Sequence, residues 1–401
     1  MFVRREFIAA AVLAIAALSP SLPNAQEAVK IAVLTDIAGP LGDVTGRGSV
    51  IGAELAIEDF GGKVLGRPIQ LLSGDHQHKP EVASNIARQW LESDKVDLIA
   101  DLPNSAIMLA VNEIVRTRGG ILLSSGGQAA RLVEDACSPY GFQWTTNTYA
   151  IASGLGNLAS QPETRTWYFV QGDFAFGEAM SRDLEAAVKS SGGQLLGRIK
   201  HPPNSTDMSS FLLQAQASGA QAIALMSLGN DVALATRQAQ DFGITARQKL
   251  VATVLDITEV NSVGLDTVKG LLAPLSYYWD LDDGTRAVAA RFEKKLGRPP
   301  TAVQIGVYSG VRHYLKAVEA AGTTDRDAVA AKIRDLPVND AFVKNGTVRP
   351  NGSMVHDMIL AQVRSAPKPT SRWAVFDIVR TIPGEIAFGP LTARNCKLVQ
   401  N

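Results

Sequence analysis

The sequence predicts an α/β protein in which two doubly wound parallel-sheet lobes follow one another along the chain. Apolar runs of strand length alternate with segments whose apolar residues recur at helical spacing. The strand runs are almost continuously apolar, which is typical of parallel sheets covered by helices on both faces. The alternation occurs in two blocks with a break near residues 145–149, and a chain of about 375 residues after an N-terminal signal exceeds one ordinary core.

The first block begins with the strand VKIAVLTD and continues through three pairs of strand and helix. The segment SVIGAELAIEDF has helical periodicity and stops at Gly61-Gly62, a common helix end. The expected strands cover residues 29–36, 67–75, 96–102 and 121–125, and the expected helices cover residues 49–60, 81–93 and 105–120.

The second block repeats the alternation of strands and helices, and the C-terminal part of the chain then predicts strands without helices between them. GTVRPNGSMVHDMILAQVRS and RWAVFDIVRTIPG predict β-hairpin strands over residues 346–365 and 372–384. Before them we expect strands at 166–173, 221–231, 249–256 and 270–280, and helices at 151–160, 177–193, 232–243, 285–297, 304–322 and 326–336.

An export signal is predicted at the N-terminus. Arg4 and Arg5 form a basic start, and the apolar stretch 7–18 is shorter than the ~20 residues that a membrane-spanning helix needs. Small residues and prolines follow, and Ala25 is a reasonable last residue before cleavage. We therefore expect residues 1–25 to be a cleaved signal peptide and the mature chain to be periplasmic. A buried N-terminal helix is the alternative, and the sequence leaves Sec and twin-arginine export open.

The charge balance excludes two classes of partner. Lys and Arg total 39 and Asp and Glu also total 39, so the formal net charge is zero. Nucleic-acid binders and polybasic membrane-surface proteins usually carry a basic excess, so neither class is expected. After the signal, no segment is long enough to cross a membrane.

The two cysteines, Cys137 and Cys396, are predicted to form a disulfide, because an even pair in an exported protein usually does. Two buried free thiols are the alternative. A catalytic thiol is not expected, since neither cysteine has a neighbouring histidine or helix start.

Four junctions at which a strand should give way to a helix carry small or polar residues. Helix N-termini offer unpaired N–H groups and partial positive charge to a ligand carboxylate, and glycines allow close approach. Doubly wound folds bind ligands at the carboxyl edge of the sheet, so two facing edges predict a cleft between the lobes. The alternative is ordinary N-capping by Asn104, Ser105 and Asn230. The junctions are residues 39–46, 102–105, 124–128 and 228–231.

Other motifs point away from catalysis. GRGSVIG lies about ten residues after the strand that ends at Asp36, too far for a dinucleotide fingerprint. His76 and His78 with Asp75 could hold zinc, but without a third ligand cluster a solvated loop is the expected state. We therefore expect no cofactor, no metal and no catalytic residue.

Three further features have two interpretations each. Phe174 and Phe176 either belong to a core or pack on an apolar group of a ligand. The aromatic cluster at 277–279 falls where the chain would cross between lobes, so hinge packing competes with a ligand contact. Asp256 ends a strand and either pairs with a ligand amine or caps the following turn.

Four stretches of the sequence resemble exported solute-binding proteins of branched-chain amino acid type ABC transporters. They are GGKVLGRPIQLLSGDHQHKPEVASNIARQWLESDKVDLIAD, DFAFGEAMSRDLEAAVKSSGGQLLG, NSTDMSSFLLQAQASGAQAIAL and YSGVRHYLKAVEAAGTTDRDAVAAKI. The resemblance implies the type I periplasmic binding protein fold, in which two lobes joined by a three-strand hinge close on a small ligand and dock on an inner-membrane permease. It implies an N-terminal lobe of residues 26–148 and 278–343, a C-terminal lobe of 149–277 and 344–390, and a tail of 391–401.

The resemblance also places the ligand contacts. Members that bind amino acids have Ser at the position of Asn104, Thr near Gln128, Tyr at the position of Phe176 and an acid near Asp256. The departures at Asn104 and Phe176, and Val44 in place of an aromatic, imply an aromatic or other organic acid, whereas Asp256 favours an amine-bearing ligand such as an amino acid. The expected ligand-binding residues are Asp43, Val44, Thr45, Leu102, Pro103, Asn104, Gly126, Gly127, Gln128, Tyr149, Phe176, Leu228, Gly229, Asn230, Asp256 and Tyr278.

The expected function is delivery of a small carboxylate ligand to an ABC permease by a monomeric binding protein. A ligand sensor of the same fold that signals to a receptor or regulator is the alternative. An exported α/β enzyme is not expected, because the few histidines lie outside the predicted rim and no nucleophile–base pair accompanies them.

Overall fold

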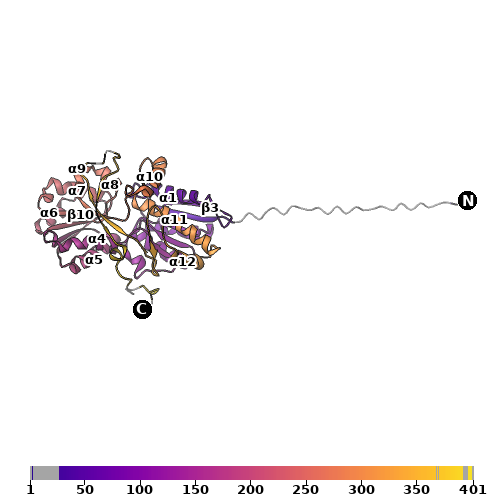
Figure 1. Ribbon diagram of the computed structural model, residues 1–401. Coiled ribbons are helices and arrows are strands. Elements are labelled where there is room, and N and C mark those ends of the chain that lie inside the picture. Colours follow the sequence, from indigo (N-terminus) through magenta and orange to yellow (C-terminus); the bar gives the residue numbers. More distant parts are fainter. Residues whose placement is uncertain (1, 3–26, 367, 369, 392–395, 400–401) are drawn as a thin grey trace.

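The computed structural model describes residues 2, 27–366, 368, 370–391 and 396–399, and shows two lobes side by side (Figure 1). Apart from residue 2, the predicted signal peptide at residues 1–25 lies outside the described residues. Within the described part of the chain, no helix has the length and apolar character needed to cross a membrane.

The first lobe is built on a six-stranded sheet of order β2-β3-β1-β4-β5-β6. Adjacent strands of this sheet run parallel, except that β2 and β3 form an antiparallel hairpin. Without β2, the order is the doubly wound one, with the first strand inside the sheet. The strands are β1 (Val29–Thr35), β2 (Lys63–Val64), β3 (Arg67–Asp75), β4 (Leu98–Asp101), β5 (Ile121–Ser124) and β6 (Gly141–Gln143).

Helices cover both faces of this sheet. Along β1, Ile31 and Val33 pack in the core shared with α1 and α11, whereas Ala32 and Leu34 pack on the side of α2 and α3. Both faces of the strand are therefore buried, which explains its continuous apolar sequence. The helices are α1 (Gly46–Asp59), α2 (Pro80–Gln89), its π-helical continuation η1 (Trp90–Asp94), α3 (Ser105–Arg118), η2 (Ala130–Val133), α10 (Asp283–Leu296), α11 (Ala302–Ala321) and α12 (Arg326–Asp335).

The second lobe contains a seven-stranded sheet of order β15-β14-β11-β10-β9-β7-β8. The first five strands in chain order repeat the doubly wound parallel pattern, but β14 and β15 pair antiparallel. Both sheets are thus mixed and mostly parallel, because a tight hairpin at an edge requires an antiparallel return. The strands are β7 (Thr166–Gly172), β8 (Gln194–His201), β9 (Ala222–Met226), β10 (Lys249–Ala252), β11 (Leu272–Leu275), β14 (Met358–Val363) and β15 (Phe376–Ile382).

The helices of the second lobe lie on both faces of its sheet, in two separate apolar clusters. One cluster contains side chains of α6 to α9, and the other contains those of α4 and α5. These elements are α4 (Thr148–Gly156), η3 (Asn157–Ser160), η4 (Pro162–Thr164), α5 (Ala175–Ser190), α6 (Ser209–Ala217), α7 (Asn230–Asp241), η5 (Ile244–Ala246), α8 (Ile257–Val263), α9 (Leu265–Val268) and α13 (Gly384–Ala387).

The chain passes between the lobes after β6, after β11 and after β13. The short pair β12 (Thr347–Val348) and β13 (Met354–Val355) belongs to the first lobe in its packing, since Val348 and Met354 lie in the first core. The strand predicted at 270–280 ends at Leu275, because the chain then leaves the sheet for the other lobe.

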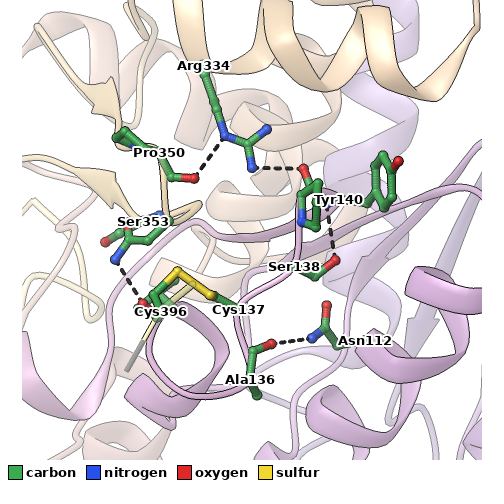
Figure 2. The surroundings of a disulfide bond; sticks show 12 residues. Asn112, Ala136, Cys137, Ser138, Tyr140, Arg334, Pro350, Ser353 and Cys396 are labelled. Carbon is green, nitrogen blue, oxygen red and sulfur yellow. Dashed lines mark hydrogen bonds between the residues drawn. A yellow bond between two sulfur atoms is a disulfide. The ribbon is translucent and has the colours of Figure 1, made fainter. Parts of the chain in front are cut away.

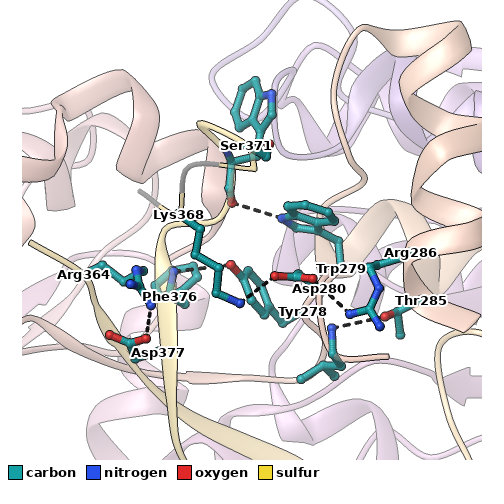
Figure 3. Close-up of polar contacts among 12 residues, drawn as sticks. Tyr278, Trp279, Asp280, Thr285, Arg286, Arg364, Lys368, Ser371, Phe376 and Asp377 are labelled. Atoms are coloured by element: carbon teal, nitrogen blue, oxygen red, sulfur yellow. Dashed lines mark hydrogen bonds and ion pairs between the residues drawn. The ribbon is translucent and has the colours of Figure 1, made fainter. Parts of the chain in front are cut away.

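The aromatic cluster at 277–279 packs at the second of these crossings (Figure 3). The ring of Tyr278 meets Phe376 of β15 edge-on, with centroids 5.8 Å apart. Trp279 Nε1 donates to the carbonyl of Trp373 over 3.0 Å. Asp280 pairs with Arg286 of α10 at 3.1 Å and with Lys368 at 2.8 Å. The cluster therefore serves as hinge packing, one of its two predicted roles.

Cys137 and Cys396 form a disulfide with Cα atoms 5.6 Å apart, as the sequence predicts (Figure 2). Cys137 precedes β6 in the first lobe, and Cys396 belongs to the tail that follows the second lobe. The bond therefore returns the tail to the first lobe across a sequence separation of 259 residues.

Candidate functional site

A cavity lies between the two lobes and contains about 880 Å³ of empty space, part of which opens to solvent. Residues that follow the carboxyl ends of strands in both lobes supply most of its wall, as expected for doubly wound sheets. The first lobe contributes Leu41, Val44, Thr45, His78, Pro103, Asn104, Ser105, Gly126, Gln128, Ala302 and Val303. The second lobe and hinge contribute Thr146, Ile151, Phe174, Phe176, Leu228, Thr253, Val254, Leu255, Asp256, Glu259, Pro274, Leu275 and Ser276.

Nine of the predicted ligand-binding residues line this cavity. They follow six different strands, so the junction rule brings residues from both lobes to one cavity. These residues are Val44, Thr45, Pro103, Asn104, Gly126, Gln128, Phe176, Leu228 and Asp256.

Seven predicted residues lie outside the lining. Leu102 is fully buried, and Gly127 packs so closely on Met108 that an added Cβ would lie 2.6 Å from its sulfur. Tyr149 lines a separate hollow beside Arg349, and Asn230 is exposed at the start of α7. The others act through the backbone or at the hinge: the carbonyl of Asp43 accepts from Gln304 at 3.2 Å, the N–H of Gly229 donates to Glu259 at 2.9 Å, and Tyr278 packs on Phe376.

Asn104 caps α3 and still faces the cavity. Its Oδ1 accepts from the N–H groups of Ala106 and Ile107 at 2.9 and 3.1 Å, which is the N-capping that the sequence offered as an alternative. These two bonds fix the amide, and its Nδ2 lies 3.0 Å from His78 Nε2. The preceding Asp101 and Leu102 have φ angles of 85° and 62°, a left-handed turn that directs Asn104 towards the cavity.

The prediction of a solvated loop around His76 and His78 is wrong. His76 is completely buried, and its Nδ1 accepts from the N–H of His78 at 3.0 Å. His78 lines the cavity, so the expectation that all histidines lie outside the rim is also wrong. The sequence could have predicted His78 as a cavity residue, because it follows the carboxyl end of β3 just as Asn104 follows that of β4.

Two acids stand on the second-lobe side, and Glu259 was not predicted. Asp256 Oδ1 accepts from Ile257 N at 2.6 Å, and Oδ2 accepts from Ala302 N at 3.0 Å. Glu259 accepts from Gly229 N at 2.9 Å and from Asp256 N at 2.6 Å. Burial raises the pKa of Asp256 to about 6, and burial together with the charge of Asp256 raises the pKa of Glu259 to about 7.

The remaining wall combines apolar side chains with hydroxyl and amide groups such as those of Thr45, Ser105 and Gln128, and its positive potential comes from helix ends. Phe174 and Phe176 lie with ring centroids 6.1 Å apart and planes 23° from parallel. The helices α1, α3, α5 and α11 begin at the cavity, and their first N–H groups carry partial positive charge. No lysine or arginine belongs to the lining within the described residues. The arrangement suits a small anion with an apolar body.

A metal site is not formed here. Among the residues that the structure describes, no group of three or more His, Cys, Asp or Glu side chains is placed to hold an ion.

Comparison with known proteins gives consistent matches over nearly the whole chain. A model described as "Periplasmic binding protein" matches residues 28–368. A periplasmic binding protein from Burkholderia mallei is 38% identical and superposes with a TM-score of 0.89, covering 93% of this chain and 99% of that one.

Two further solved structures are similar to this chain. A branched chain amino acid ABC transporter periplasmic ligand-binding protein from Burkholderia xenovorans is 38% identical, with a TM-score of 0.84 and coverage of 92% and 99%. A solute-binding protein from R. palustris, solved in complex with benzoate, shares the fold at 17% identity, with a TM-score of 0.81 and coverage of 92% and 100%.

Proposed function

Because this chain belongs to the periplasmic binding protein family, and to its branched-chain amino acid type, we propose that it is the substrate-binding component of an ABC importer. It traps a small carboxylate ligand between its lobes and delivers it to a permease in the inner membrane. The predicted export signal supports a periplasmic location, and the protein acts as a monomer.

The observation that carries the proposal is the composition of the cavity wall. The N-termini of α1 and α5, which no side chain caps, and the Nδ2 group of Asn104 offer hydrogen-bond donors, while Phe174, Phe176 and Leu228 offer apolar surface. A ligand that contacts both lobes binds the closed state more tightly than the open one, and that difference is what shifts the equilibrium to closure.

The contacts of the two acids favour an organic acid over an amino acid. Each carboxyl oxygen of Asp256 and of Glu259 already accepts a backbone N–H. Phe176 lacks the hydroxyl that a tyrosine at this position would offer to the ammonium group of an amino acid. The proposed ligand is therefore an aromatic or other apolar acid without an amine requirement, and a branched-chain amino acid is the competing ligand.

Thermal unfolding of residues 26–401 with benzoate, 3,4-dihydroxybenzoate, L-leucine and L-valine tests the proposal. A ligand present at 100 times Kd stabilises the folded state by about 2.7 kcal/mol, which raises Tm by several degrees. A shift with the aromatic acids and none with the amino acids is expected. A shift with leucine or valine alone refutes the ligand class, and no shift with refolded, ligand-free protein refutes the proposal itself.

Matched variants locate the binding site. Phe174 is half-buried beside the cavity, whereas Phe242 is 36% exposed at the end of α7. Phe174→Ala is expected to raise Kd for benzoate about tenfold, since an aromatic pair is worth about 0.5–1.5 kcal/mol beyond the area that it buries. Phe242→Ala is expected to leave Kd unchanged. Equal affinities in the two variants contradict the placement.

A further inference from the structure

His78 is the residue of the cavity wall that can present a positive side chain to an anionic ligand. Its side chain is 33% exposed and follows the carboxyl end of β3. It is also the one histidine, lysine or arginine in the lining, as far as the described residues extend. The backbone at Gln77 and His78 is left-handed, with φ angles of 52° and 57°, and this turn places the ring at the cavity.

The partner of its Nε2 atom sets the protonation state in the unliganded site. Asn104 cannot rotate its amide without losing the two N–H bonds to Oδ1, so Nδ2 must face His78. An NH₂ group donates, and Nε2 must therefore accept. The ring is consequently neutral, with its proton on Nδ1, which lies 3.7 Å from Asp36 Oδ2.

Asp36 supplies the reason for this ring to accept a second proton. The Asp36 side chain is fully buried, and no lysine or arginine pairs with it among the described residues. Burial opposes its charge, but the hydrogen bonds and the nearby histidines outweigh burial and lower its pKa. The neighbouring His76 stays neutral at pH 7, because burial lowers its pKa to about 4. Only His78 can then give Asp36 a positive partner.

We infer that His78 recognises the ligand carboxylate as an imidazolium and takes up one proton from solvent when the ligand binds. This inference rests on the proposed function and names a residue that sets its specificity. The added proton turns Nε2 from an acceptor into a donor, and it releases Asn104 Nδ2. Both groups then donate to the carboxylate, whereas in the unliganded site Nδ2 donates to Nε2.

Other titratable groups face the same space and must be separated from His78. Asp36, Asp75, His76 and Asp101 lie on its own lobe, and Asp256 and Glu259 face it across the cavity. An approaching anion also favours protonation of the two acids. Proton uptake by the wild-type protein is therefore not decisive, and the comparison with a variant is.

The test is calorimetric titration with benzoate and 3,4-dihydroxybenzoate, in two buffers of different ionisation enthalpy, at pH 6, 7 and 8. In the wild type, affinity should rise about tenfold from pH 8 to pH 6, because binding takes up a proton. His78→Gln preserves an acceptor for Asn104 but cannot titrate. It should lower proton uptake at pH 7 and flatten the pH profile to about threefold. Lys79→Gln removes an exposed charge next to His78 and should behave like the wild type.

The outcomes separate the two proposals. Binding with unchanged proton uptake in His78→Gln overturns the role of His78 and leaves the proposed function intact. No binding of either acid to the wild type overturns both. Should His78→Gln fail to fold, imidazole nitrogen NMR of the wild type decides. Among the five histidines, one ring must become doubly protonated on benzoate addition at pH 7, and no change refutes the inference.

Discussion

The Asp256 carboxylate of the second lobe accepts a hydrogen bond of 3.0 Å from the backbone N–H of Ala302 in the first lobe. Ala302 is the first residue of α11, a 20-residue helix, so the negative charge lies at its positive end. The other oxygen of Asp256 caps α8. One side chain therefore joins two helix starts across the cleft, which couples the lobes at the wall of the cavity.

Replacing Asp256 by Asn should loosen closure. The amide keeps one acceptor, but it loses the charge that two helix N-termini stabilise, typically by 0.3–1 kcal/mol each. We expect Kd for the ligand to rise roughly three- to tenfold, with little change in secondary structure. Isothermal titration of Asp256→Asn, beside the exposed control Asp266→Asn on α9, measures this. Identical affinities in the two variants would show that the contact does not support closure.

Asp101 should make the protein less stable as the pH rises from about 4 to about 7. Burial raises its pKa to about 7, whereas an unfolded aspartate titrates near ~3.9. Between these values the folded state holds a proton that the unfolded state has lost, so this group lowers the free energy of unfolding as pH rises from about 4 to about 7.

The variant Asp101→Asn removes that penalty and tolerates the φ of 85°. It should match the wild type at pH 4 and exceed it by about 2–4 kcal/mol at pH 8. Urea unfolding at both pH values is the measurement, with the exposed Asp241→Asn as control. A difference that does not grow with pH contradicts the assigned burial effect.

The sequence predicts the buried parts of the fold more reliably than its edges. In β1, alternate side chains enter two cores, so the apolar run leaves no doubt about the strand. The edge strand β8 and the helix α6 were not predicted. In β8 half-buried and exposed positions alternate, and Leu196 is 41% exposed, so the strand lacks the apolar run on which the other predictions rest.

The residues of the site also differ in how far the sequence predicts them. Residues directly after a strand, such as Asn104 and Gln128, follow from the rule that ligands bind at the carboxyl edge. Ala302 reaches the cavity only because the lobes meet in a particular way, and no local pattern encodes that meeting. His78 obeyed the rule but sat in an H-x-H motif, whose usual interpretation is an exposed loop.

Reduction of the disulfide should destabilise the protein and leave binding intact. Loss of a native cross-link typically costs 2–5 kcal/mol. Because Cys137 and Cys396 are the two cysteines of the chain, a thiol reductant acts on this bond alone. Neither residue lines the cavity. We expect Tm to fall by several degrees in dithiothreitol and in Cys137→Ala/Cys396→Ala, with Kd unchanged. A large change of Kd would mean that the tail controls the cleft.

Asn104→Asp separates helix capping from ligand recognition. An aspartate caps α3 as well as asparagine does, so the free energy of unfolding should change by less than about 0.5 kcal/mol. It also replaces the donor that faces His78 and the cavity by an anionic oxygen. A carboxylate ligand should then bind at least about tenfold more weakly, because like charges meet in a poorly solvated space.

The variant Asn104→Ala tests the capping role alone, since it should lose about 1 kcal/mol of stability through the missing cap. Calorimetric titration and urea unfolding of both variants give the two quantities. Unimpaired binding of benzoate by Asn104→Asp would place the ligand carboxylate elsewhere in the cavity.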